Sequence, residues 1–177
     1  MKVLIPIAEQ IEEMEVVILK DVLVRAGYEV FLFSIVDCEY ITGTRGVQIK
    51  PDGLLSHECV WDLIVVPGGM PGAKNLSQSE TLKSVLQEHV AAGKVYGGIC
   101  AAPAVVLKPW GLLPQKHKTC HPSFAHKLHS WSPQKVCFAD NCITSQGPGT
   151  AFAMALFLIE HLSGRELREK VEAPLCL

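Results

Sequence analysis

The segment Leu63-Ile64-Val65-Val66-Pro67-Gly68-Gly69 (LIVVPGG, residues 63–69) decides the fold. Its first four residues are all apolar, a pattern typical of a strand that a parallel sheet buries on both faces. Pro-Gly-Gly then ends the strand, so a tight turn is expected directly after it. A second strand is predicted over residues 95–99 (VYGGI), and it ends at Cys100.

Strand-like and helix-like segments alternate outward from these two. Further strands are predicted over residues 2–7, 28–36, 136–139 and 142–145. Helices are predicted over 11–26, 79–92, 101–107 and 149–162, with glycine stops at 27, 93 and 164. A hairpin is expected within 38–51 and a polar, His-rich loop over 115–133. This alternation predicts one α/β domain over residues 1–177, a doubly wound, mostly parallel sheet with helices on both faces.

The composition excludes several classes of protein. Of 177 residues, 49% are hydrophobic and 19% charged, which favours one globular domain over a disordered chain. The net charge of -2 argues against a nucleic-acid partner. No apolar run approaches the roughly 18 residues of a membrane span, and acidic residues follow the first strand instead of a signal-peptide cleavage site. Seven irregularly spaced cysteines indicate free thiols, so we expect a cytoplasmic protein.

Cys100 is the candidate nucleophile. It lies in Gly97-Gly98-Ile99-Cys100-Ala101-Ala102-Pro103, between a predicted strand and a predicted helix. Small neighbours on both sides are typical of a nucleophile elbow, and a helix N-terminus lowers the pKa of a thiol. The alternative interpretation is a small buried residue in a tight turn.

A cysteine nucleophile needs a partner that moves a proton. The candidates are Glu15 and His121, although the cluster that includes Glu12 and Glu15 could instead be an acidic first helical turn. The backbone amides of Gly69 and Ala101 could form an oxyanion hole. The histidines and cysteine of residues 117–129 match no standard zinc spacing, so no metal is expected.

Taken together, the order and spacing of these motifs resemble the DJ-1/ThiJ/PfpI superfamily, in its DJ-1 branch. The similar segments are residues 12–15 (EEME), 25–27 (RAG), 45–47 (RGV), 66–69 (VPGG), 75–77 (NLS), 99–103 (ICAAP), 144–150 (TSQGPGT) and 173–175 (APL). The resemblance implies a flavodoxin-like sandwich, a homodimer and catalysis without a cofactor.

The resemblance also implies roles for individual residues. Cys100 would be the reactive cysteine, Glu15 a protonated carboxyl bonded to it, and His121 the nearby histidine. Gly69 and Ala101 would present backbone amides to the sulfur. Glu12 and Arg45 would make contacts beside the site and across the dimer.

Several positions depart from related branches. Ala101 stands where the PfpI-type peptidases have histidine, so peptidase activity is not expected. Glu160 and His161 have the wrong order for a glutamine amidotransferase. Gln146 replaces an arginine that is common in the animal branch, and Lys50 lies near the position of a cysteine in the animal hairpin.

Two functions from different classes follow from the resemblance. The first is a glyoxalase that needs no glutathione and acts on methylglyoxal or glyoxal, with protein deglycase activity on glycated protein. In it, Cys100 would attack the aldehyde carbon, and Glu15 or His121 would move the proton between carbons. The second is a redox sensor or chaperone-like protein of oxidative stress, in which Cys100 is oxidised to sulfinate.

Overall fold

The computed structural model describes residues 1–177, and its centre is one seven-stranded sheet in the order β5-β2-β1-β6-β7-β9-β8. The strands are β1 (Lys2–Ile7), β2 (Glu29–Ser34), β5 (Gly53–Leu54), β6 (Leu63–Val66), β7 (Val95–Ile99), β8 (Val136–Ala139) and β9 (Cys142–Ser145). All pairs in the sheet are parallel except β8 with β9. The five central strands have the order of a flavodoxin-like fold, which confirms the predicted fold class.

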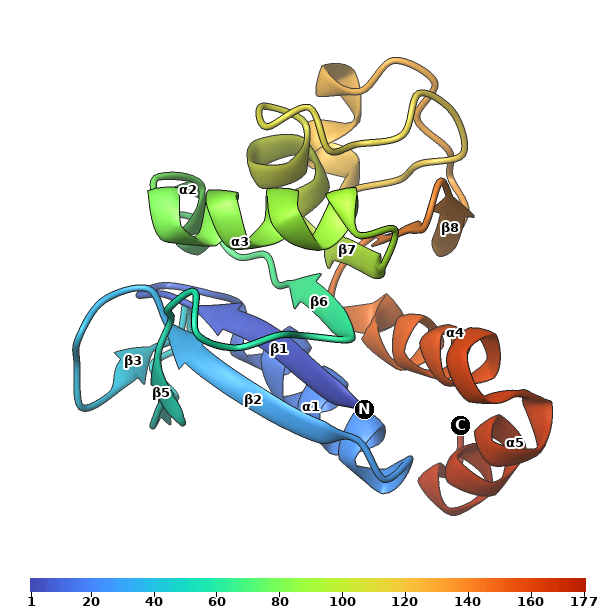
Figure 1. The fold of residues 1–177 in the computed structure, drawn as a ribbon. Helices are drawn as coiled ribbons and strands as arrows, with labels where there is room; N and C mark the ends of the chain where they lie inside the picture. Colours follow the sequence, from blue (N-terminus) through green and yellow to red (C-terminus); the bar gives the residue numbers. More distant parts are fainter.

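Helices cover both faces of this sheet. They are α1 (Glu13–Arg25), α2 (Gly72–Ser77), α3 (Glu80–Ala91), α4 (Ala151–Ser163) and α5 (Arg165–Glu172). Figure 1 shows α1 and α4 on one side of the sheet and α3 on the other. This arrangement buries β6 along its whole length, as its apolar sequence predicts.

The hairpin predicted within residues 38–51 is formed by β3 (Ile41–Thr42) and β4 (Gln48–Ile49), which pair antiparallel outside the main sheet. Figure 1 shows β3 beside β5, the strand at one edge of the sheet. The loop between β3 and β4 reaches back to α1, since Thr44 N–H donates to the Ile11 carbonyl oxygen. The hairpin is therefore anchored beside the start of α1.

Three details differ from the sequence prediction. The segment predicted as a helix over 101–107 forms a π-helical turn, η1 (Pro103–Leu107), after an irregular start. A 3-10 helix, η2 (Pro122–Lys127), lies inside the predicted polar loop. Helix α5 follows Gly164, although the helix before it was expected to be the last strong one. Its sequence, RELREKVE, is largely polar and has only two apolar residues, Leu167 and Val171, which lie one helical turn apart.

No helix of the structure combines the length and the apolar character needed to cross a membrane.

Candidate active site

The carboxyl ends of β6 and β7 bring Gly68 and Cys100 together. The two strands pair in parallel, with Val66 opposite Gly98, so the residues that follow them meet at one edge of the sheet. A β-carbon on Gly68 would lie 2.5 Å from the Cys100 β-carbon and 2.9 Å from the Ala101 nitrogen. Only glycine allows the two turns to approach this closely.

Cys100 has the strained backbone of an elbow. Its φ of 62° lies in the left-handed region, which a residue with a β-carbon rarely adopts. Hydrogen bonds on both sides hold this conformation. Its N–H donates to the Ser145 carbonyl oxygen at 3.0 Å, and its carbonyl oxygen accepts from the His121 N–H at 2.8 Å. The strain and its supports are typical of a functional residue.

Glu15 reaches the cysteine from the first turn of α1. The side chain is completely buried, and Oε2 accepts a 2.7 Å hydrogen bond from the Gly68 N–H. Oε1 is also buried but has no hydrogen-bond partner, and the carboxyl interacts with the Cys100 thiol. Burial raises the pKa of Glu15 to about 7, against the lowering effect of the Gly68 hydrogen bond and of the neighbouring Cys100 thiol. The carboxyl can therefore hold a proton near neutral pH.

The sulfur of Cys100 is in the environment that the motifs predict, but its pKa moves in the opposite direction. Burial and the negative charge of Glu15 raise the pKa of Cys100 to about 12. Hydrogen bonds from the backbone amides of Gly69 and Ala101 act against both. The expectation of a lowered pKa was wrong because it counted the helix terminus and left out desolvation. A protonated Glu15 would carry no charge and would remove the repulsion.

The backbone amides of Gly69 and Ala101 lie near enough to the sulfur to lower the pKa of Cys100, so they are candidate donors to an oxyanion that forms beside it. Gly69 has φ of 87°, and a β-carbon there would lie 2.4 Å from the Glu12 nitrogen. This glycine is required both by its conformation and by its contact with the start of α1.

His121 is joined to the elbow through its backbone. Its side chain turns toward Ser123, with Nδ1 2.7 Å from the Ser123 hydroxyl oxygen and accepting from the Ser123 N–H at 3.3 Å. A nitrogen that accepts carries no proton in neutral histidine, so Nε2 is the protonated atom. The backbone of His121 is therefore bonded to Cys100, but its ring is bonded to Ser123 and makes no hydrogen bond to the sulfur.

Glu12 and Arg45 lie at the edge of this site. The Glu12 carboxylate accepts from the Thr44 hydroxyl at 3.3 Å, and its charge contributes to the raised pKa of Glu15. The exposed Arg45 guanidinium donates to the Thr44 carbonyl oxygen at 3.4 Å. No acidic side chain lies within ion-pair distance of the Arg45 guanidinium.

Glu13 has a structural role that the sequence analysis did not predict. It is buried, and its carboxylate accepts from the Arg45 N–H at 2.7 Å and from the Thr44 hydroxyl at 3.0 Å. A β-carbon on Gly43 would lie 2.5 Å from Glu13 Oε2, so this glycine makes room for the carboxylate. No local sequence pattern links Gly43 to Glu13, because the two lie in segments that only the fold brings together.

The loop at Gln146 lies next to the elbow. Gln146 Nε2 donates to the Pro133 carbonyl oxygen at 2.9 Å, so the amide is bound within the protein. The Thr150 hydroxyl accepts from the backbone N–H groups of Gln146 and Gly147. All seven cysteines are free, and no three acidic, histidine or cysteine side chains are grouped to hold a metal ion.

Fold and site together define a cysteine-centred α/β protein, in which a buried carboxyl and two backbone amides surround the thiol of a strand–turn–helix elbow. A profile of the DJ-1/PfpI family matches residues 1–161, and the chain belongs to that family. The relatives place it in the branch of DJ-1 homologues.

Three relatives illustrate the match. Protein DJ-1 homolog A of Arabidopsis thaliana is 40% identical over 93% of this chain and 43% of its own length. The glutathione-independent glyoxalase DJR-1.2 of Caenorhabditis elegans is 36% identical over 96% of this chain and 92% of its own. The structure of oxidised Toxoplasma gondii DJ-1 superimposes with a TM-score of 0.94 at 41% identity, covering 99% and 97% of the two chains. This chain spans less than half the length of the two plant relatives.

Proposed function

We propose that this protein is a cysteine-dependent, cofactor-free glyoxalase that converts methylglyoxal and glyoxal to hydroxy acids. The observation that carries the proposal is the buried Glu15 carboxyl, with one oxygen unpaired, beside the Cys100 thiol. A relative of 36% identity is named a glutathione-independent glyoxalase, which supports the same chemistry.

In the first step, Cys100 Sγ attacks the aldehyde carbon and forms a carbon–sulfur bond, which gives a hemithioacetal. The thiol proton passes, by way of Glu15 or solvent, to the oxygen of the hemithioacetal, which leaves the Glu15 carboxylate free for the next step. The developing oxygen charge would be stabilised by the amides of Gly69 and Ala101, which lie beside the sulfur. No metal or nucleotide is needed for this addition.

In the second step, the proton on the former aldehyde carbon moves to the neighbouring ketone carbon. One carbon is oxidised and the other reduced, so no outside oxidant is required, and the product is a thioester of the hydroxy acid. Glu15 is the base best placed for this transfer, with His121 as the other candidate. Water then hydrolyses the thioester, which releases lactate from methylglyoxal and returns the thiol.

The experiment is the formation of lactate from methylglyoxal in the absence of glutathione. We expect the purified protein to form one lactate for each methylglyoxal that it consumes. Consumption of methylglyoxal without lactate would contradict the proposal, because it would indicate simple trapping by thiols and amines.

We include protein deglycase activity in the proposal, since the adduct of an arginine or cysteine with methylglyoxal carries the same two carbons. The test uses a preformed adduct with free methylglyoxal removed by a scavenger. Continued release of lactate supports a direct action, whereas its loss would assign the activity to the free aldehyde.

The alternative is a redox sensor that stops at cysteine sulfinate. Two observations favour it: the unpaired Glu15 oxygen could donate a proton to a sulfinate oxygen, and the similar Toxoplasma gondii protein has been crystallised in oxidised form. Graded peroxide followed by peptide mass measurement tests it. Two added oxygen atoms should appear on Cys100 before the exposed Cys59 or Cys176.

We further propose that the domain of residues 1–177 acts as a homodimer. One face of α1 supports this, because Met14, Val17 and Val24 are about half exposed at helical spacing. Val47 of the hairpin is exposed to a similar degree, and Arg45 is free to contact a partner nearby. Such an apolar face is typical of an interface.

A further inference from the structure

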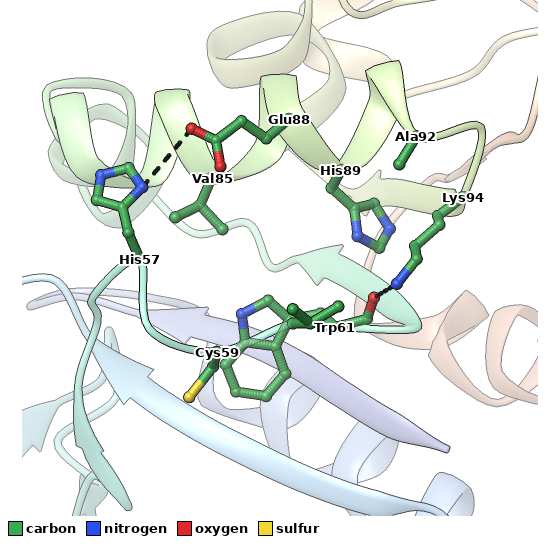
Figure 2. A pocket seen from close by; sticks show the side chains of 9 residues that line it. His57, Cys59, Trp61, Val85, Glu88, His89, Ala92 and Lys94 are labelled. Carbon is green, nitrogen blue, oxygen red and sulfur yellow. Dashed lines mark hydrogen bonds and ion pairs between the residues drawn. The ribbon is translucent and has the colours of Figure 1, made fainter.

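A cavity of about 180 Å³ lies between the loop at residues 57–61 and helix α3. None of the residues that line it belongs to the Cys100 site. Figure 2 shows the Trp61 indole forming its floor, with Val85 and His89 of α3 above the indole. A cavity of about 150 Å³ with apolar walls is large enough to bind benzene, so this one has room for a substituted aromatic ring.

The floor of the cavity carries an unsatisfied hydrogen-bond donor. Trp61 is 3% exposed, and its indole Nε1 is buried without a partner. Figure 2 shows Nε1 on the edge of the ring that faces Val85 and His57. Phe31 and Phe33 pack edge-on against the indole, with centroids 5.7 and 5.3 Å away, and so fix its orientation. A buried donor left unpaired costs about 1–3 kcal/mol, which a ligand acceptor would offset.

The charged groups around the cavity are already paired. Lys94 Nζ donates to the Trp61 carbonyl oxygen at 2.5 Å and lies 3.9 Å from an Asp62 carboxylate oxygen. His57 lies 3.8 Å from the Glu88 carboxylate across the opening. His89 Nε2 donates to the Val95 carbonyl oxygen, and burial lowers its pKa, so its ring is neutral. No free cation remains to bind an anion.

From these features we propose that the cavity is a binding site for a small, neutral, mostly apolar molecule. Its carbonyl oxygen accepts the Trp61 Nε1–H after a small shift of the side chains that cover this nitrogen. Val60 and Val85 would contact its apolar body. This cavity is separate from the Cys100 site, so the proposal does not depend on the proposed glyoxalase activity.

Benzamide is the probe, because it is neutral, fits one aromatic ring and carries a carbonyl oxygen. The chain has three tryptophans, so a ¹H–¹⁵N spectrum gives three indole signals, and the Trp61→Phe variant assigns one of them. We expect benzamide to shift the Trp61 signal in a saturable manner. The Trp131 signal is the internal control, since its Nε1 already donates to the Cys120 carbonyl oxygen at 3.2 Å.

A second readout uses Cys59, an exposed thiol at the cavity, with exposed Cys176 as the internal reference. Bound benzamide should slow the alkylation of Cys59 and leave Cys176 unchanged. Trp61→Phe keeps an aromatic ring but removes the donor, and it should weaken this protection about 5- to 10-fold. Ala92→Phe changes an exposed lining residue, keeps the indole N–H and should block entry.

Toluene and benzoate complete the test. Toluene has no hydrogen-bond acceptor, so it should bind at least about fivefold more weakly than benzamide. Benzoate should also bind more weakly, because its charge finds no free cation and meets the Glu88 carboxylate. An unmoved Trp61 signal up to the solubility limit of benzamide, equal binding of toluene, or tighter binding of benzoate would each overturn the proposal.

Discussion

Glu15 connects the sequence, the burial and the chemistry at the scale of one residue. An acidic side chain in the first turn of a helix is ordinarily exposed, yet this one is completely buried beneath the cysteine elbow. Burial raises its pKa to about 7, so it can be an acid or a base near neutral pH. The same burial carries a cost in stability once the carboxyl ionises.

That cost depends on pH in a defined direction. Between its ordinary pKa of 4.5 and about 7, Glu15 holds its proton in the folded protein but has lost it in the unfolded chain. The free energy of unfolding should therefore fall, by about 3 kcal/mol, as the pH rises through this window. Glu15→Gln cannot ionise and should lack this fall.

Denaturant unfolding of wild type and Glu15→Gln at several pH values measures this fall in the free energy of unfolding. Glu166→Gln is the matched control, because Glu166 is exposed on α5. A stability difference between wild type and Glu15→Gln that stays constant from pH 4.5 to 8 would contradict the assignment of a raised pKa.

Gly68 sets how closely the two turns of the site approach each other. In Gly68→Ala, the new β-carbon would lie 2.5 Å from that of Cys100, so the elbow must move. We expect a loss of about 1–3 kcal/mol in unfolding free energy and at least a tenfold loss of glyoxalase activity. Gly149→Ala is the control, since a β-carbon there meets nothing within 4 Å. Equal activity of the two variants would show that the close approach is not needed.

At the scale of elements, the buried Glu13 carboxylate makes two of the hydrogen bonds that hold the loop between β3 and β4 to the start of α1. Burial alone would raise the pKa of Glu13, but hydrogen bonds from its own N–H, from Arg45 N–H and from the Thr44 hydroxyl leave it lowered. Glu13→Gln should weaken this attachment, because a bond to a charged group contributes about 1.5–3 kcal/mol. Amide hydrogen exchange at Arg45 should become about 10- to 100-fold faster.

Glu29→Gln serves as the control, because this exposed glutamate lies at the start of β2, away from the hairpin loop. If the Arg45 amide exchanges at the same rate in Glu13→Gln and wild type, the carboxylate does not hold the loop.

The elements that could be predicted are those with a clear apolar pattern. Strands β1, β6 and β7 and helices α1, α3 and α4 fall close to their expected bounds, because each buries a face or both faces. Helix α2 and strand β5 were missed because they are short. Helix α5 was missed because it is short and largely polar, with only Leu167 and Val171 as apolar residues, and it is stabilised by packing against α4.

Prediction of the site was likewise limited to residues that lie in recognisable local motifs. The motifs and the family resemblance pointed to Cys100, Glu15, Gly69 and Ala101, which the structure brings together. Desolvation of the thiol and the buried contacts of Glu13 depend on the packing of distant segments, which no local pattern records.

At the scale of the whole molecule, the exposed apolar face of α1 predicts self-association. Val17 lies in the middle of that face and is 53% exposed. Val17→Asp should convert a particle of twice 19.3 kDa into one of 19.3 kDa in light scattering coupled to gel filtration. Val60→Asp, at an exposed position away from α1, should leave the mass unchanged. A wild-type protein of 19.3 kDa at micromolar concentration would contradict the proposed homodimer.

The central claim is that one cysteine of seven carries the chemistry. The most direct measurement compares kcat/KM for lactate formation from methylglyoxal, without glutathione, in wild type, Cys100→Ser and Cys59→Ser. We expect Cys100→Ser to lose about 1,000-fold or more and Cys59→Ser to keep wild-type activity. Undiminished lactate formation by Cys100→Ser would contradict the claim.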